Sequence, residues 1–245
     1  MSKYKVIFVF KIHLMLKKTY LNWSSGKDAS MALYQLQQES DFSVDLLLTS
    51  VNGHHNRVSM HGLRREVLER QVKALGIEME TIELPEEPTM DEYSQIMENK
   101  VQDLKNRSFE YSAFGDIFLE DLKKYREDQL DKLNMKSVFP LWKRNTKELL
   151  EEFLKNGFKA IVVTVNANLL DESFAGRIID ENFISDLPEN VDPCGENGEF
   201  HTFCFDGPIF KQPVEFEVGE KVYREYNSPN GEKGEKIGFW YCDLH

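Results

Sequence analysis

Paired cysteines, long apolar runs and an excess of positive charge are all missing from this 245-residue chain. The three cysteines include no C-x-x-C pair, which argues against a zinc or iron–sulfur site and favours reduced thiols in the cytoplasm. The apolar run Val6–Phe10 is too short to span a bilayer and lacks a small-residue cleavage site, so we expect no membrane partner. We interpret residues 1–14 as an extension outside the folded core.

Negative charge dominates the composition. The 42 Asp and Glu against 30 Lys and Arg give a formal net charge of -12. A nucleic-acid-binding surface needs clustered Lys and Arg, so this balance argues against nucleic acid as a partner. Hydrophobic residues make up 41% and include 17 Phe, enough for a globular core of one large or two modest domains. The composition leaves a homo-oligomer open.

Two common phosphate-binding glycine motifs, G-x-x-x-x-G-K-[ST] and G-x-G-x-x-G, are absent near the amino end. Residues 24–30 instead read S-S-G-K-D-A-S, between the apolar run Tyr20–Trp23 and an amphipathic segment. The amides of such a loop and the following helix N-terminus would bind an anion, and Lys27 would add a full positive charge. A helix N-cap in a surface turn is the simpler alternative, which the position after a strand disfavours.

Strand-like and helix-like segments alternate through most of the chain. The predicted strands are Tyr20–Trp23, Val44–Val51, Glu78–Leu84, Tyr111–Phe114, Val138–Trp142 and Ala160–Val165. The predicted helices are Lys27–Gln38, Gly62–Leu75, Met90–Asn106, Leu119–Leu133 and Thr146–Asn156. This alternation predicts an α/β fold, a parallel sheet with helices on both faces.

The sequence changes character from Pro188 onward, where Pro, Gly, Asn and acidic residues are interleaved with Phe. Strand-like alternation returns at Val214–Val218 and Phe239–Tyr241. We therefore predict a smaller α+β C-terminal domain. The first domain, which contains the loop at residues 24–30, would span residues 15–135, and the second residues 136–245.

Residues 192–203 form a second polar cluster, which reads D-P-C-G-E-N-G-E-F-H-T-F. Three carboxylates, an amide and a histidine in a dozen residues can hold magnesium, position an amine or accept its proton. An acidic β-turn with a solvated face is the alternative. Because the loop at residues 24–30 already suggests a phosphate site, we favour a functional role for residues 192–203 over a solvated turn.

Together the two segments resemble the diphthine-ammonia ligase family of PP-loop ATPases, within the adenine nucleotide alpha hydrolase-like superfamily. The family loop is usually written S-G-G-K-D-S, so Ser25 replaces a glycine and Ala29 a serine. Further matching residues are Phe114–Ile117, Pro140–Trp142, Gly176, Arg177, Asp180 and Asp206–Pro208. The resemblance covers the chain from Met15 onward and implies a HUP-like, Rossmann-like sheet. It also implies that residues 15–135 are a PP-loop ATP-binding domain and residues 136–245 a substrate-binding and catalytic domain.

The resemblance also implies a reaction. A carboxylate attacks the α-phosphate of ATP, pyrophosphate leaves, and ammonia converts the acyl-adenylate into an amide. The implied cofactors are ATP and Mg²⁺, and the implied partners are ammonia and a small-molecule or protein-borne carboxylate. The residues that would hold the nucleotide are Ser24, Ser25, Gly26, Lys27, Asp28, Ala29 and Ser30, with Asp28 also binding the metal.

Four residues are the predicted catalytic groups: Lys27, Glu196, Glu199 and His201. Lys27 would offset charge on the departing pyrophosphate. The two glutamates would handle ammonium and the acyl-adenylate, with His201 as an alternative proton acceptor or else a structural histidine.

Three further residues are predicted to bind substrate: Asp116, Arg177 and Asn197. Simpler alternatives stay open for several of these assignments. Asp28 could be a first-turn acid that favours its helix dipole, and Asp116 a helix N-cap. Arg177 could pair with Asp180 along a helix.

Two residues bear on the substrate. Asn197 and His201 depart from the pattern G-E-G-G-E-Y-E-T that we associate with diphthamide formation, and the form here resembles bacterial members. A cobalamin-related amidation is suggested for those members by analogy. The rival hypotheses are another PP-loop ATP pyrophosphatase that modifies RNA or a metabolite, and a sensor that holds ATP without turnover.

Three histidines, His54, His55 and His61, gather around the end of the second predicted strand. Metal binding by such a group would need a carboxylate partner, which the sequence does not make apparent. We expect a flexible surface loop over ATP instead.

Overall fold

The computed structural model describes residues 16–59, 61–86, 88–227 and 236–245, so the predicted extension at residues 1–14 lies outside it. Sheet A contains β1 (Lys17–Asn22), β2 (Phe42–Asn52), β3 (Arg57–Val58), β4 (Glu78–Leu84), β5 (Tyr111–Ala113) and β6 (Lys136–Val138). Five of these strands run parallel in the order β4-β2-β1-β5-β6. The short β3 pairs antiparallel with the end of β2.

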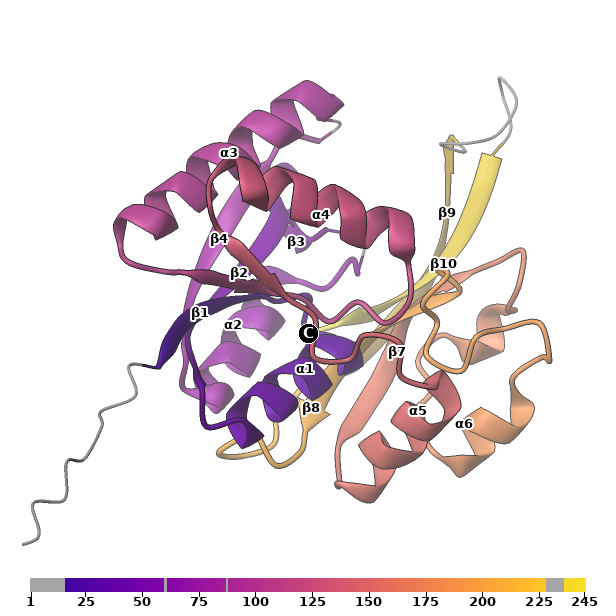
Figure 1. Ribbon diagram of the computed structural model, residues 1–245. Helices are drawn as coiled ribbons and strands as arrows, with labels where there is room; N and C mark the ends of the chain where they lie inside the picture. Colours follow the sequence, from indigo (N-terminus) through magenta and orange to yellow (C-terminus); the bar gives the residue numbers. More distant parts are fainter. Residues whose placement is uncertain (1–15, 60, 87, 228–235) are drawn as a thin grey trace, which may run out of the picture.

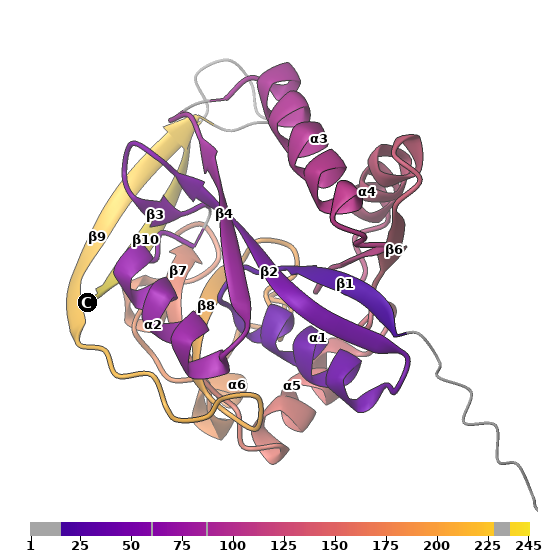
Figure 2. The same ribbon diagram turned by 90° about the vertical axis from the view of Figure 1, so that its left-hand side faces the viewer.

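Helices cover both faces of sheet A (Figures 1 and 2). They are α1 (Lys27–Gln38), α2 (Arg65–Leu75), α3 (Met90–Asn106) and α4 (Glu120–Lys132). Successive strand residues point to opposite faces, so Leu21 and Leu47 pack with α1 and α2, whereas Tyr20 and Leu46 pack on the side of α3 and α4. Strands buried on both faces are typical of a parallel sheet.

A smaller antiparallel sheet follows in the second half of the chain. Sheet B has the order β8-β7-β10-β9, with β7 (Lys159–Asn166), β8 (Phe200–Asp206), β9 (Val218–Asn227) and β10 (Lys236–Leu244). The short helices around it are α5 (Thr146–Lys155), the 3-10 helix η1 (Glu172–Phe174) and α6 (Glu181–Asp186). The predicted parallel sheet with a smaller α+β part is confirmed.

Sheet B shares an apolar core with α1 and α2. The backbone N–H of Cys204 in β8 donates to the carbonyl of Ser25, at 2.9 Å, so β8 lies directly beside the loop after β1. β6 extends sheet A past residue 135, and the two predicted domain ranges stay a prediction.

Local signals explain why several helices begin or end where the sequence predicts. Gly76 ends α2 in the left-handed conformation, with φ 71°, which costs glycine little. Thr89 caps α3, because its hydroxyl accepts from the Glu92 N–H while the Glu92 carboxylate accepts from the Thr89 N–H. Asn145 caps α5 through the Glu148 N–H, at 3.0 Å.

Other predicted boundaries were wrong. The strand placed at Val138–Trp142 is β6 at Lys136–Val138 followed by a turn, because Pro140 has no N–H to pair. The strand placed at Val214–Val218 is β9, which begins at Val218, while Phe216 packs on Phe203 and Phe205 without joining a ladder.

Four elements were not predicted from the sequence, and one helix starts late. The missed elements are β3, η1, α6 and β8. The helix placed from Gly62 begins at Arg65, because Gly62 has φ 66° and cannot be in a right-handed helix.

The structure bears on the expectations for the cysteines and for membrane-spanning segments. All three cysteines are free and buried. Within the part of the chain that the structure covers, no helix combines the length and the apolarity that crossing a membrane would need.

Candidate active site

The loop Ser24–Gly26 connects the carboxyl end of β1 to the first residue of α1. Gly26 is the helix N-cap, and its carbonyl accepts hydrogen bonds from the N–H of Ser30 at 3.1 Å and from the Ser30 hydroxyl at 2.9 Å. The first turn of α1 is packed closely, because a Cβ on Gly115 would lie 3.0 Å from the nitrogen of Ala29. Open parallel sheets bind ligands at this edge, outside the carboxyl ends of the strands.

Ser25 occupies the most unusual backbone position in the loop. Its φ is 71°, in the left-handed region that favours glycine, the residue usual at this position in the family pattern. The Ser25 carbonyl accepts from the Gln71 side chain at 2.9 Å, and Gln71 also donates to the Cys204 carbonyl. The Ser25 hydroxyl is buried and has no hydrogen-bonding partner among the described residues. A buried polar atom in this state is a candidate ligand-binding group.

Lys27 is only 2% exposed, although it carries the charge expected to bind phosphate. Its Nζ lies 2.8 Å from both carboxylate oxygens of Asp28 and donates to the carbonyl of Cys194. Its backbone N–H donates to the Thr202 hydroxyl at 3.0 Å. Burial alone would lower the pKa of Lys27, but the neighbouring negative charges, led by Asp28, raise it to about 12. Lys27 therefore joins the first loop to the second.

The residues 192–199 form a compact loop that is held by its own carboxylates. One oxygen of Asp192 accepts from the N–H groups of Cys194 and Glu196, at 3.1 and 3.0 Å. One oxygen of Glu199 accepts from the Asp192 N–H and from the Asn197 side chain, both at 3.0 Å. Glu199 is 1% exposed, and within the described structure its second oxygen has no partner. Glu199 and Asn197 thus shape this loop.

Carboxyl groups from two other segments, those of Glu196 and Asp116, act on Asp28 or on one another beside the first turn of α1. Glu196 accepts from the Ile117 N–H at 2.7 Å, which ties the second loop to the connection after β5. Burial raises the pKa of Glu196 to about 7, and the charges of Asp28 and Asp116 contribute to the increase. Burial also raises the pKa of Asp116, against the effect of Arg126, whose Nε lies 2.9 Å away. One member of this group can therefore change its charge near neutral pH.

Two histidines stack beside the first loop. The rings of His61 and His201 lie 4.6 Å apart, with an interplanar angle of 28°. Burial and the charge of Lys27 lower the pKa of His201 to about 4. Burial, and then His201, lower the pKa of His61 well below its usual value. Both imidazoles are therefore neutral at pH 7 and only weakly basic.

The structure brings together most of the residues that the sequence singles out. The loop Ser24–Gly26 and Lys27 lie against β8 and the second loop through backbone and side-chain hydrogen bonds. Asp116 and Glu196 are charge neighbours of Asp28, and Lys27 is a charge neighbour of His201. Arg177 is bound elsewhere: it pairs with Asp186 at 2.8 Å and lies over the rings of Phe174 and Phe183. Asp180 is the N-cap of α6, so the alternative pairing of Arg177 with Asp180 along a helix is wrong. Asp116 is no N-cap either, because α4 is capped at Leu119.

Three contributors to the site were not predicted from the sequence. Thr202 accepts from Lys27, the carbonyl of Cys194 accepts from the same residue, and His61 contacts His201 and the Thr202 carbonyl. Thr202 stands inside the segment 192–203, so its position was a usable signal. A backbone carbonyl leaves no trace in the sequence, and the approach of His61 depends on how β3 folds back.

Two family models match the sequence of this chain. The N-terminal domain of diphthamide synthase matches residues 17–137, and the C-terminal domain of diphthamide synthase matches residues 145–234. These matches cover most of the chain. The chain belongs to the diphthamide synthase family.

Several relatives carry the name diphthine–ammonia ligase. The relative from Rattus norvegicus is 28% identical over 200 residues, 76% of this chain and 71% of that protein. The relative from Homo sapiens is 29% identical over 166 residues, 62% of each chain. The relative from Bos taurus is 34% identical over 110 residues, 42% of this chain and 41% of that protein, so the chain spans less than half of its length.

A solved structure from Methanocaldococcus jannaschii, titled as a predicted subunit of tRNA methyltransferase, has a more limited similarity. It matches 60% of this chain and 80% of that chain at 16% sequence identity, with a TM-score of 0.41. A similarity of this size supports no conclusion about function.

Proposed function

We propose that this protein is an ATP-dependent amide ligase of the diphthine–ammonia ligase type. A carboxylate oxygen would attack the α-phosphorus of ATP, the bond to the β-phosphate would break, and pyrophosphate would leave. Ammonia would then attack the acyl carbon of the adenylate, and AMP would leave as the nitrogen loses a proton. The supporting observation is that Lys27, the first residue of α1 after the loop Ser24–Gly26, contacts the acidic loop 192–199 directly.

The first loop suits the departing pyrophosphate. Its N–H groups stand at the N-terminus of α1, where the helix dipole favours an anion, and the buried Ser25 hydroxyl is free to donate. A phosphate oxygen would replace the Cys194 carbonyl as the acceptor for Lys27. Each such preorganised donor can stabilise a developing charge by about 3 kcal/mol.

The same surroundings suit Mg²⁺. Asp28, Asp116 and Glu196 supply carboxylate oxygens, which are the ligands that magnesium prefers. Burial is the main cause of the raised pKa of Glu196, the charges of Asp28 and Asp116 add to it, and a bound cation would relieve that repulsion. Asp28 is the residue that we assign to hold the ion, which would supply charge neutralisation for the phosphates.

Glu196 is the best placed group to accept a proton from the nitrogen. Its pKa of about 7 makes it ionised in part at neutral pH and able to take up a proton. His201 is the weaker alternative acceptor, because a pKa of about 4 leaves its imidazole neutral but makes it a poor base at neutral pH. Glu199, by its bonds to Asp192 and Asn197, would position Glu196 within the loop.

The acid that is amidated is proposed only as a class. The relatives' name favours a diphthine-like, protein-borne carboxylate, and a small-molecule acid is the alternative. The charge of Asp116 acts on Glu196, and we assign Asp116 to bind substrate beside it. Arg177 has its charge paired with Asp186, so we assign it a weaker part in substrate binding.

A product assay tests this function. The purified full-length chain is incubated with ATP, Mg²⁺, ammonium and a panel of diphthine-like and small carboxylic acids. We expect AMP and pyrophosphate in equal amounts, and the mass change of a carboxyl group that becomes an amide. Formation of ADP would contradict adenylation, and ATP that stays bound but intact would favour a sensor.

A further inference from the structure

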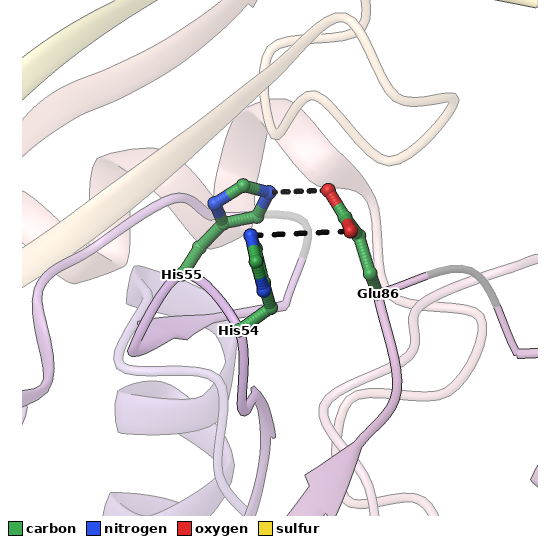
Figure 3. Close-up of side chains that lie close together, drawn as sticks. All are labelled: His54, His55 and Glu86. Atoms are coloured by element: carbon green, nitrogen blue, oxygen red, sulfur yellow. Dashed lines mark ion pairs between the residues drawn. The ribbon is translucent and has the colours of Figure 1, made fainter.

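A cluster of possible metal ligands lies away from Lys27, at the corner of sheet A where β2 and β4 end. The two strands are parallel and paired to their last residues, Asn52 opposite Leu84. The turn after β2 therefore meets the segment after β4. His54 and His55 are in this turn, and Glu86 follows β4, with both imidazole rings turned toward its carboxylate (Figure 3).

The sequence-based expectation for these histidines was wrong in two respects. The carboxylate partner exists, but it comes from a segment about thirty residues further along the chain. His61 does not belong to the group, because it stacks on His201.

The three side chains are close enough to bind one ion. The Nε2 of His55 lies 3.2 Å from one oxygen of Glu86, and the Nε2 of His54 lies 4.0 Å from the other. One ligand atom from each residue lies within 4.8 Å of the others. Ligand atoms around a tetrahedral zinc ion are about 3.3 Å apart, given zinc–ligand distances near 2.0 Å. Small side-chain rotations would close the difference, and all three residues are exposed enough to make them.

Asn52 holds the two backbones that carry these ligands. Its side-chain oxygen accepts from the N–H of His55 at 3.0 Å, and its side-chain nitrogen donates to the carbonyl of Glu86 at 3.3 Å. The Gly53 N–H adds a bond to the Leu84 carbonyl at 3.0 Å. One amide thus fixes the spacing of the two segments, as outer residues do around metal sites.

We propose that His54, His55 and Glu86 form a site for one divalent transition-metal ion, with zinc as the best match. Two imidazole nitrogens and a carboxylate oxygen suit zinc, cobalt or nickel, whereas calcium and magnesium prefer oxygen ligands alone. Three protein ligands leave at least one position open to water or to a further ligand. The site is separate from the carboxylates around Lys27, and its test does not depend on the proposed reaction.

An ordinary pair of exposed ion pairs is the competing explanation. Such pairs contribute at most about 1 kcal/mol, and they do not require two rings to converge on one carboxylate. The two explanations differ in what they predict for metal binding.

Isothermal titration of the untagged, chelator-treated full-length chain with zinc chloride tests the proposal. We expect one tight site per chain. His55→Ala and Glu86→Gln should each weaken binding at least about tenfold, and Asn52→Ala should weaken it by about the same factor through misplaced ligands. Circular dichroism confirms that each variant is folded, and cobalt absorption spectra report its ligands directly.

His245→Ala is the matched control, because His245 is another exposed histidine beside a carboxylate, 3.7 Å from Glu217. This variant should bind zinc as the unchanged chain does. The proposal is overturned if the unchanged chain binds no stoichiometric zinc. It is also overturned if folded His55→Ala and Glu86→Gln bind zinc as tightly as His245→Ala.

Discussion

The two loops of the candidate site reach their shapes in different ways. The loop Ser24–Gly26 takes its shape from backbone geometry, a left-handed Ser25 followed by the N-cap Gly26. The loop 192–199 takes its shape from side chains, since Asp192 and Glu199 accept its N–H groups. The first loop thus presents the N-terminus of α1 at the proposed anion site, whereas the second brings the Cys194 carbonyl and the Glu196 carboxylate to Lys27.

The largest expected effect comes from removing the group that joins the two loops. Lys27→Ala takes away the charge that would stabilise departing pyrophosphate, so ATP-dependent pyrophosphate release should fall about 10³-fold. The rate is measured with ammonium and an accepted acid in excess. Lys17→Ala is the control, because Lys17 forms an exposed ion pair with Asp41 at 3.1 Å. Equal rates for the two variants would remove Lys27 from the reaction.

Glu196→Gln tests whether the second loop contributes chemistry as well as shape. Burial raises the pKa of Glu196 to about 7, so the carboxylate becomes a proton acceptor as the pH rises through that value. The unchanged chain should therefore gain rate over the variant between about pH 6 and pH 8, approaching a ratio of about 10². Taking the ratio cancels the rise in free ammonia with pH. Exposed Glu148→Gln is the control.

The same substitution has a signature in stability. Below the usual carboxyl pKa, folded and unfolded chains both bind the proton, and the contribution of protonated Glu196 is fully present. Between that value and about 7 the folded chain binds more protons, so its stability falls relative to Glu196→Gln as the pH rises. Urea unfolding across this range measures the difference, and parallel curves for the two proteins would contradict the raised pKa.

The sequence predicts features that depend on local signals, and it does not predict contacts between distant segments. Local signals predict the bounds of several elements. Hydrophobic periodicity gives α1 and α3, Gly76 ends α2, and Pro85 ends β4. β8 was missed because its polar residue Thr202 faces Lys27 and so interrupts the apolar pattern. The motif of the first loop was readable, but the Cys194 carbonyl and the stacking of His61 exist only once the chain has folded.

A smaller effect is expected where the first loop packs against His61 and against Thr202 of β8. Gly26 has φ -85°, which alanine can adopt, but a Cβ would lie 3.0 Å from the His61 ring and 3.2 Å from the Thr202 carbonyl. Gly26→Ala should therefore cost about 1–3 kcal/mol of stability through overpacking. Gly53→Ala is the control, because its Cβ would meet a flexible Glu83 carboxylate at 3.4 Å. Equal unfolding midpoints for Gly26→Ala and Gly53→Ala would show that the first loop packs loosely against His61 and Thr202.

The smallest effect tests whether the first loop owes its shape to backbone conformation alone. A left-handed conformation costs a non-glycine residue about 1–2 kcal/mol, part of which the greater freedom of unfolded glycine offsets. Ser25→Gly, which restores the family pattern, should raise the free energy of unfolding by about 1 kcal/mol. Gly157→Ala measures the same strain in reverse, because Gly157 has φ 80° and no atom within 4 Å of a Cβ. A loss of stability in Ser25→Gly would mean that the buried Ser25 hydroxyl contributes more than the strain costs, and the shape of the first loop would then depend on a side chain, as that of the second does.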